Sequence, residues 1–275
     1  MNNFAVLETT KLHLTNAIVI KIATNNPCHL TCYYSLKPPG RHKTARTDRG
    51  LTLPWGAYFC FVAYKSVEQI EAGDTLSHTF VVPDWFISQL RWFVFRGTVS
   101  GILSPSVSCI FKHLHTGQNL ILNPGMENWS GPVGDAPDHW VYLPSPHHNL
   151  HYADPAIKTE GQYSCRTDNN TNYGSFRLIQ DLDYSLLDNL RLTFKVDLRG
   201  EAPSRNSTRV QAYGDTEAYK LKYLTLNYTW ETIELPILLP NNLTRLYVRS
   251  DNWNQGSPTP FQTWADNWRV LYTPA

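Results

Sequence analysis

Two segments in the second half of the chain alternate polar or aromatic residues with aliphatic ones. They are Arg209-Val210-Gln211-Ala212-Tyr213 and Arg245-Leu246-Tyr247-Val248-Arg249. Successive side chains of a β-strand point to opposite faces, so each segment would place its Arg, Gln and Tyr side chains on one face. Tyrosine rings can stack on the CH faces of a sugar, and guanidinium and amide groups can donate paired hydrogen bonds to hydroxyls or uronates. If the two strands share a sheet, the sequence predicts one carbohydrate-binding cleft, with Trp129, Tyr173 and Trp253 in loops at its edge.

The same outward side chains also suit a contact between subunits. Arginine and aromatic residues are enriched at protein–protein interfaces. The sequence therefore leaves two interpretations open for this face, a glycan site or a sheet surface covered by a neighbouring subunit.

A group of histidines could bind a metal ion. They are His139, His147, His148 and His151, in a segment that also holds Pro144 and Pro146. A metal site would use His147 and His151 with a carboxylate such as Asp154. Nothing in the sequence fixes the geometry of these groups, so a surface loop is the preferred interpretation.

The segment 41–49 concentrates Lys and Arg residues and could contact a phosphate or another polyanion. It is one short run on a chain of near-zero net charge, so a solvated hairpin loop is preferred.

Signatures of catalysis are lacking in the sequence. It contains no GxSxG, no HExxH and no glycine loop of the kind that cradles phosphates. Asp181 and Asp183 lie two residues apart, whereas a glycosidase needs carboxyl groups facing each other across a cleft. We expect no enzymatic activity.

The composition favours an all-β protein. The chain has 275 residues with 24 Lys and Arg and 23 Asp and Glu, a formal charge of +1 that lacks the basic excess of a general nucleic-acid binder. Aromatic residues make up 13% and charged residues only 17%, with Pro and Gly spread along the chain. No apolar run is long enough to span a membrane, and the start Met1-Asn2-Asn3-Phe4 does not resemble a signal peptide. The 5 Cys residues are an odd number without paired CxxC spacing, so we expect reduced thiols buried in strands.

The first domain is predicted at residues 1–113 as a β-sandwich of six or seven short strands. The β-rich runs are 17–22, 29–34, 57–64, 78–82, 91–96 and 107–111, separated by turn clusters such as Asn25-Asn26-Pro27. The runs 73–80, 91–97 and 104–106 resemble the second half of a fibronectin type III domain, which implies an Ig-like sandwich and no particular chemistry.

A short polar connector, 114–118, leads to a second domain at 119–275. Leu190, Leu192, Phe194, Val196 and Leu198 alternate with polar residues, as in a strand with one buried face.

The second domain resembles the carbohydrate-binding jelly rolls of the galactose-binding-like group, including carbohydrate-binding families 4, 9 and 22. The landmarks that carry this resemblance are the opening Asn123-Pro124-Gly125-Met126-Glu127-Asn128-Trp129, then Pro137-Asp138-His139-Trp140, the run 160–166, Gln180, Trp230-Glu231 and the closing run 264–270. The resemblance implies a jelly-roll sandwich. It also implies a structural Ca²⁺ between Glu127 and Asp266, since hard oxygen ligands suit that ion. The alternative is that these carboxylates lie on the surface or pair with a base such as Arg269.

These features together lead to a functional hypothesis. Modules of extracellular type on a chain without a visible signal peptide are typical of virion proteins of tailed bacteriophages, which are made in the host cytoplasm and released by lysis. We therefore expect a non-enzymatic virion surface protein, such as a capsid decoration, head fibre or tail-associated subunit. Its partners would be other virion subunits in a homo-oligomer or lattice, with weak multivalent binding to cell-surface glycans.

Two alternatives remain. One is a solitary glycan-binding protein, cellular or part of a larger secreted glycoside-hydrolase system. The other is an oligomeric scaffold without a ligand.

Overall fold

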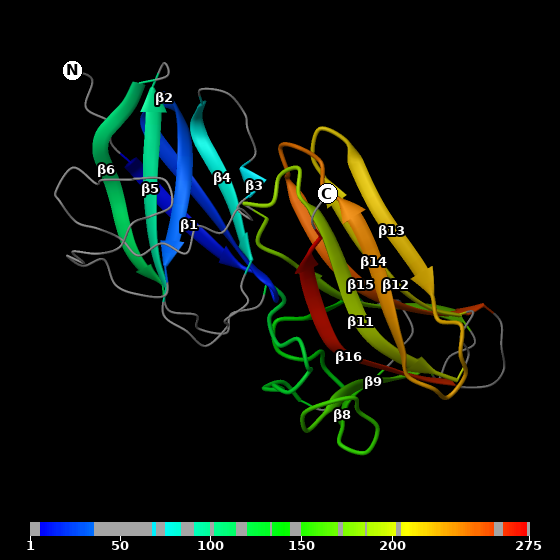
Figure 1. Ribbon diagram of the computed structural model, residues 1–275. Coiled ribbons are helices and arrows are strands. Elements are labelled where there is room, and N and C mark those ends of the chain that lie inside the picture. The colour runs from blue at the N-terminus through cyan, green and yellow to red at the C-terminus, as the bar shows by residue number, and fades with distance from the viewer. Residues whose placement is uncertain are drawn as a thin grey trace. The chain divides into compact units, whose positions relative to one another are not determined.

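The structure is a computed structural model in which the chain forms two compact units, Met1–Gln118 and Asn119–Ala275 (Figure 1). It describes residues 6–35, 68–69, 75–83, 91–99, 102–113, 120–132, 134–143, 150–169, 173–184, 186–201, 205–255 and 261–273. All the regular elements within these ranges are β-strands, as expected for the all-β class. Across the same ranges, no helix has the length and hydropathy needed to cross a membrane.

In the first unit, the described residues form one six-stranded sheet of order β3-β4-β2-β5-β6, with β1 paired to β2. The strands are β1 (Val6–His13), β2 (Ala17–Ser35), β3 (Glu68–Gln69), β4 (Thr75–Pro83), β5 (Arg91–Val99) and β6 (Ile102–His113). The β-branched run at the start of β2 buries Ile18, Ile20 and Ile22 completely. A complete two-sheet sandwich of fibronectin type III kind is not shown by the described residues, and the predicted strand 57–64 lies outside them.

The expected turn at Asn25-Asn26-Pro27 was wrong. Strand β2 continues through these residues, and its pairing with β4 shifts register between Ala23 and Cys28. A β-bulge can take up additional residues without ending a strand, which is how this polar, proline-containing stretch fits.

The second unit is a sandwich of two five-stranded sheets. Sheet I has the order β13-β12-β15-β10-β7, and sheet II has the order β14-β11-β16-β9-β8. Sheet I contains β7 (Val141–Leu143), β10 (Tyr173–Asp181), β12 (Asn206–Tyr213), β13 (Glu217–Tyr223) and β15 (Arg245–Gln255). Sheet II contains β8 (Leu150–Asp154), β9 (Ser164–Asn169), β11 (Arg191–Gly200), β14 (Glu231–Leu238) and β16 (Phe261–Tyr272).

Alternating apolar side chains of both sheets build the core of this unit. Leu192, Phe194, Val196 and Leu198 of β11 are fully buried, as the period-two pattern predicts. Trp268 of β16 is also fully buried, with its ring centroid 5.2 Å from that of Trp140. This core fixes which face of each sheet points outward.

Candidate functional site

The two polar–aromatic segments lie on neighbouring strands of sheet I. In the β12–β15 ladder, Arg209 is opposite Arg249, Gln211 is opposite Tyr247, and Tyr213 is opposite Arg245. Residues directly opposite each other carry their side chains on the same face. The intervening Val210, Ala212, Leu246 and Val248 are completely buried on the inner face. The structure therefore brings the six predicted residues together on one surface, called here the outer face of sheet I.

A hydrogen-bond network centred on Gln211 fixes the middle of this face. The hydroxyl of Tyr247 donates to Gln211 Oε1. Gln211 Nε2 donates to the hydroxyl oxygen of Tyr213 at 2.6 Å and to Glu217 Oε1 at 2.5 Å. Gln211 is only 7% exposed and Tyr247 only 6%. These side chains form a rigid floor rather than a free binding surface.

The expectation that Tyr247 lies outside the core and offers a stacking surface was therefore wrong. The guanidinium of Arg245 lies 4.8 Å from the centre of the Tyr247 ring, and the Tyr213 ring lies 6.5 Å away. Burial raises the pKa of Tyr247. Its ring supports the neighbouring side chains, and Tyr213, which is half-buried, is the more accessible of the two.

Exposed aromatic rings on this face come instead from strand β13. Tyr219 is opposite Gln211 and is 59% exposed, and Tyr223 is opposite Ser207 and is 47% exposed. The sequence analysis missed both residues. A signal was present in Gly214-Asp215, a typical hairpin turn between two runs of alternating residues.

The outer face also carries paired charges. Arg245 Nε donates to Asp181 Oδ1 at 2.8 Å, and this bond raises the pKa of Arg245. Arg249 Nε donates to Asp251 Oδ2 at 2.8 Å, and Arg177 Nε lies 3.7 Å from the other oxygen of Asp251. Burial raises the pKa of Asp251, an effect that the charge of Arg249 opposes. Two of the predicted arginines, Arg245 and Arg249, are thus already engaged by carboxylates.

Of the three residues expected in edge loops, two are strand residues and Trp129 lies in a loop. Tyr173 begins β10 and Trp253 belongs to β15, opposite Ser175, so both are strand residues; their side chains lie outside the described part of the structure. Trp129 is in a loop, where its indole N–H donates to the carbonyl of Met126 at 2.6 Å. That bond holds Trp129 to its own loop.

Glu127 and Asp266, the predicted calcium ligands, both accept hydrogen bonds from the segment 159–163. The backbone N–H of Gln162 donates to Glu127 Oε1 at 2.9 Å. The N–H and hydroxyl of Thr159 each donate to Asp266 Oδ2 at 2.8 Å. A Cβ atom at Gly161, whose φ is +65°, would lie 1.8 Å from Glu127 Oε1, so only glycine allows this approach.

This arrangement does not fit a cation held by both carboxylates. Amide hydrogens point at the oxygens that a cation would need, and a carboxylate oxygen has few acceptor positions. No group of three or more His, Cys, Asp or Glu residues capable of holding a metal ion occurs within the described ranges. The carboxylates instead anchor the segment 159–163, and calcium binding stays a prediction that a chelator can test.

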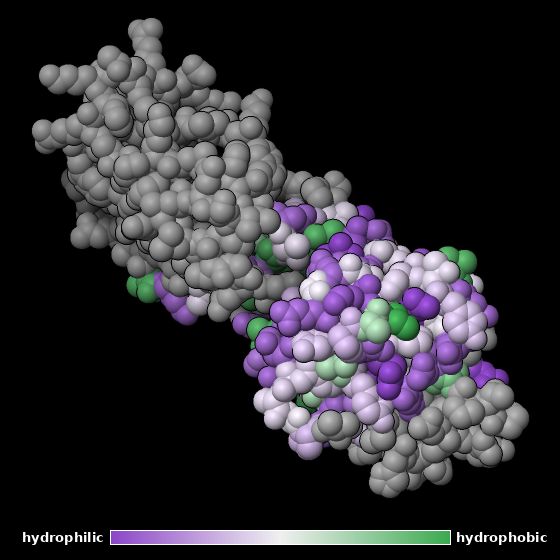
Figure 2. All heavy atoms as spheres, turned by 90° about the horizontal axis from the view of Figure 1, so that it is seen from below, coloured by the Kyte–Doolittle hydropathy of each residue, from purple (hydrophilic) through white to green (hydrophobic). Residues whose placement is uncertain are grey.

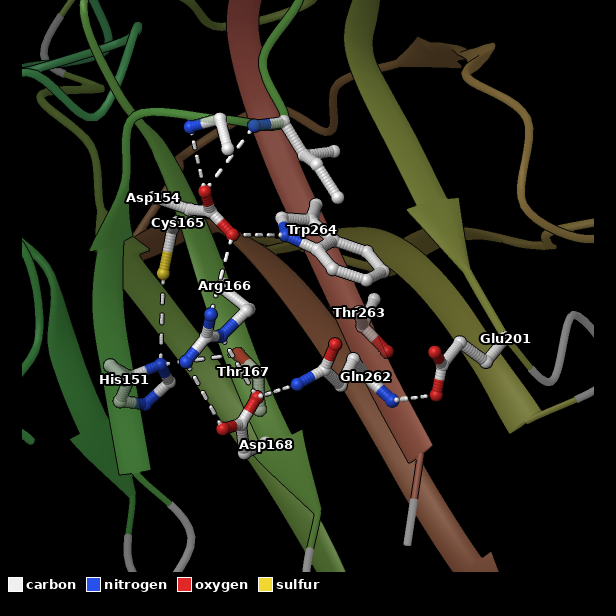
Figure 3. A network of polar contacts seen from close by, with 12 residues as sticks. His151, Asp154, Cys165, Arg166, Thr167, Asp168, Glu201, Gln262, Thr263 and Trp264 are labelled. Carbon is white, nitrogen blue, oxygen red and sulfur yellow. Dashed lines mark hydrogen bonds and ion pairs between the residues drawn. The ribbon is translucent and has the colours of Figure 1, made fainter.

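The histidine cluster is not assembled in the described residues. His147 and His148 lie outside them, and His139 is exposed in a turn. His151 is a strand residue of β8 with no exposed surface; its Nδ1 is 3.2 Å from the hydroxyl of Thr167 and 3.6 Å from the sulfur of Cys165 (Figure 3). Burial lowers the pKa of His151 to about 3 and raises that of the Cys165 thiol. The predicted surface loop is therefore wrong for His151. Cys165 and Cys28 are both buried in strands, as expected.

Asp154, the proposed third ligand, belongs to a separate network beside His151. Its Oδ2 accepts a hydrogen bond from the indole N–H of Trp264 at 2.9 Å and lies 3.5 Å from Arg166. Arg166 also pairs with Asp168 at 3.0 Å, and Gln262 joins Asp168 at 3.0 Å (Figure 3). These contacts tie β8, β9 and β16 together, which is a structural role.

Comparisons with known proteins give likenesses to solved structures only. The chain matches no family model. No curated protein matches it either.

Three solved structures illustrate the likeness. TmCBM61, solved in complex with β-1,4-galactotriose, is 16% identical over 57% of this chain and 99% of its own, with a TM-score of 0.41. The C-terminal family 22 carbohydrate-binding module of Clostridium thermocellum Xyn10B is 14% identical over 54% of this chain and 90% of its own, with a TM-score of 0.39. The enzymatically active domain of bacteriophage CBA120 tailspike protein 4 is 10% identical over 56% of this chain and 21% of its own, with a TM-score of 0.42. These values do not decide what the present chain binds.

Proposed function

We propose that this chain is a non-catalytic glycan-binding protein and that its site is the outer face of sheet I. The observation that carries the proposal is the position of two exposed rings, Tyr219 and Tyr223, beside the fixed polar floor built on Gln211. A sugar needs an apolar plate for its CH face and nearby polar groups for its hydroxyls. Tyr219 and Tyr223 supply the plates, while Arg209 and the hydroxyl of Tyr213 supply polar groups beside them.

The described surface of the second unit suits a polar ligand better than a large apolar one. Figure 2 shows that the described surface of the second unit in this view is mostly hydrophilic, with small scattered hydrophobic patches. Large contiguous apolar patches mark sites for protein or membrane partners, whereas single exposed apolar residues are normal on a soluble surface. Exposed tyrosines with hydroxyl groups and ion-paired arginines suit a wet, polar contact of the kind that sugars make.

The proposal includes a biological setting. On the surface of a tailed-phage virion, many copies of one weak site would raise the effective affinity by roughly 10² to 10⁴. The alternative is a solitary glycan-binding protein, cellular or part of a secreted hydrolase system, which needs no lattice of neighbours. Native mass spectrometry distinguishes them, because the virion hypothesis predicts a symmetric assembly and the alternative predicts a monomer.

Replacing the exposed rings tests the site. We expect Tyr219→Ala and Tyr223→Ala each to weaken retention by a glycan panel by roughly tenfold, since each variant removes a stacking surface. Tyr228→Ala is a matched control, because Tyr228 is also 59% exposed but lies in the loop after β13. Retention is measured by affinity electrophoresis, with circular dichroism to show that the fold is intact.

The Tyr219 and Tyr223 variants also separate glycan binding from subunit contact. If the Tyr219 and Tyr223 variants bind glycans as the wild type does, the outer face of sheet I is not the glycan site. If the same variants lose assembly instead, the surface is a subunit interface and the proposal is wrong.

A further inference from the structure

The outer face of sheet I contains a charge arrangement that folding alone does not favour. Arg209 of β12 is directly opposite Arg249 of β15. Like charges in directly opposite positions on antiparallel strands destabilise the pair. Local rules of this kind are broken mainly at functional sites, so the pair calls for an explanation.

Asp251 compensates the charge of two arginines on this face, Arg249 and Arg177, but not that of Arg209. It accepts a hydrogen bond from Arg249 Nε at 2.8 Å, and Arg177 Nε lies 3.7 Å from it. One carboxylate therefore serves two guanidinium groups and has its acceptor atoms engaged by both. The field of Arg209 also reaches Asp251, but without an ion pair between them.

Arg209 itself is left without an anionic partner. Within the described residues it makes no ion pair within 4.0 Å, and its buried Nε has no hydrogen-bond acceptor. Its guanidinium carbon lies 6.0 Å from the centre of the exposed Tyr219 ring. The guanidinium is thus held beside the proposed stacking plate, with its charge uncompensated.

The other carboxylates of the face are committed elsewhere. Asp181 pairs with Arg245 through two hydrogen bonds, at 2.8 and 3.3 Å. Glu217 accepts a hydrogen bond from Gln211 and lies opposite Tyr213, whereas Arg209 lies opposite Leu221. The region around Arg209 therefore has an excess of positive charge.

We propose that Arg209 selects glycans that carry an anionic substituent, a carboxylate or a sulfate, on the sugar that lies beside Tyr219. This inference rests on the proposed function and names the ligand class of the same site. The planar guanidinium presents paired donors whose spacing matches two oxygens of a carboxylate or sulfate. The bound anion would also relieve the repulsion between Arg209 and Arg249. A neutral sugar would neither accept paired hydrogen bonds as an anion does nor relieve this repulsion.

Matched pairs of glycans test the inference on the full chain. The probes are polygalacturonate with its methyl-esterified form, and dextran sulfate with dextran, together with an array of acidic and neutral oligosaccharides. We expect the wild type to prefer the acidic member of a pair by roughly tenfold, as for one hydrogen-bonded charge pair. The preference is expected to fall as salt rises, since exposed charges are screened. Carboxylate and sulfate probes are scored separately to tell the two sources of charge apart.

Substitutions assign the preference to one side chain. Arg209→Gln is expected to abolish the preference for acidic glycans, because it weakens retention of the acidic member of each pair more than retention of the neutral member. Arg209→Lys keeps the charge without the planar fork, and we expect it to restore the preference in part. Arg191→Gln is the control, because Arg191 is an exposed arginine of sheet II.

The outcomes distinguish this inference from the proposed function. Equal retention of acidic and neutral glycans by the wild type, or an acidic preference that survives Arg209→Gln, overturns the inference. Neutral binding that depends on Tyr219 and Tyr223 leaves the proposed function standing in that case. If the wild type retains no glycan of either kind, both proposals are wrong.

Discussion

Replacing His151 with glutamine is expected to make the stability of the protein markedly less sensitive to acid. His151 has no exposed surface, and burial lowers its pKa to about 3 from an ordinary value of 6.5. The folded protein therefore holds the neutral imidazole, while the unfolded chain takes up a proton as the pH falls below 6.5. The stability that this neutral histidine contributes is fully present above pH 6.5 and is lost progressively as the pH falls toward 3.

The expected size of the effect makes it measurable. Between pH 7 and pH 4, protonation of this histidine in the unfolded chain should lower the unfolding free energy of the wild type by about 3 kcal/mol. The variant lacks the histidine and does not show this loss. Urea unfolding followed by tryptophan fluorescence at several pH values gives the slope of unfolding free energy against pH for the wild type and for the variant. Carboxylates also make stability depend on pH. Burial raises the pKa of Asp154, but hydrogen bonds from Trp264 and the backbone outweigh it and leave the pKa lowered. Such contributions to the pH dependence are the same in both proteins and cancel in the difference.

His139→Gln is the matched control, because His139 is an exposed histidine of the same unit. It should leave the pH dependence as in the wild type. Parallel slopes for the wild type and His151→Gln would show that His151 is not buried as described.

Replacing Asp266 with alanine is expected to destabilise the second unit by about 3 kcal/mol, because the segment 159–160 loses the buried charged acceptor that anchors it. Asp266 is completely buried and accepts hydrogen bonds from Thr159, Glu160 and Asn267. Burial raises the pKa of Asp266, and these donors oppose the rise. Thermal unfolding of the full chain is the measurement, and Glu160→Ala, an exposed carboxylate of the same segment, is the control.

The same measurement in the presence of a chelator tests the calcium expectation. If backbone donors alone hold the carboxylates, chelator leaves the wild-type melting temperature unchanged, and Asp266→Ala lowers it with or without chelator. A chelator-dependent fall in the wild type that disappears in Asp266→Ala would instead show that the ion is bound.

The sequence predicted the faces of individual strands well, because alternation along a strand is a local property. Leu192 to Leu198 and the aliphatic residues between Arg209 and Tyr213 are buried as their period-two pattern indicates. The sequence did not predict that β12 pairs with β15; the cleft was expected only if the two strands shared a sheet. Which strands become neighbours depends on long-range contacts that no local pattern specifies.

The errors also have physical causes. Tyr247 is buried beside Arg245 of its own strand and Tyr213 of the neighbouring strand β12, and the pattern along one strand does not show what a neighbouring strand covers. Tyr219 and Tyr223 were missed because β13 is an edge strand whose side chains are mostly exposed on both faces, so its alternating residues do not correspond to one buried and one exposed face. At Asn25-Asn26-Pro27 the turn composition was overridden by pairing on both sides of the bulge.

The most direct test of the glycan site is to observe the tyrosine rings themselves during binding. The full chain is labelled with ¹³C in its tyrosine rings and titrated with the oligosaccharide that is retained most strongly. Signals of Tyr219, Tyr223 and Tyr228 are assigned from the spectra of the three alanine variants. The proposed site predicts that the Tyr219 and Tyr223 signals shift with saturation while the Tyr228 signal stays in place. Saturable binding with unmoved Tyr219 and Tyr223 signals would contradict it.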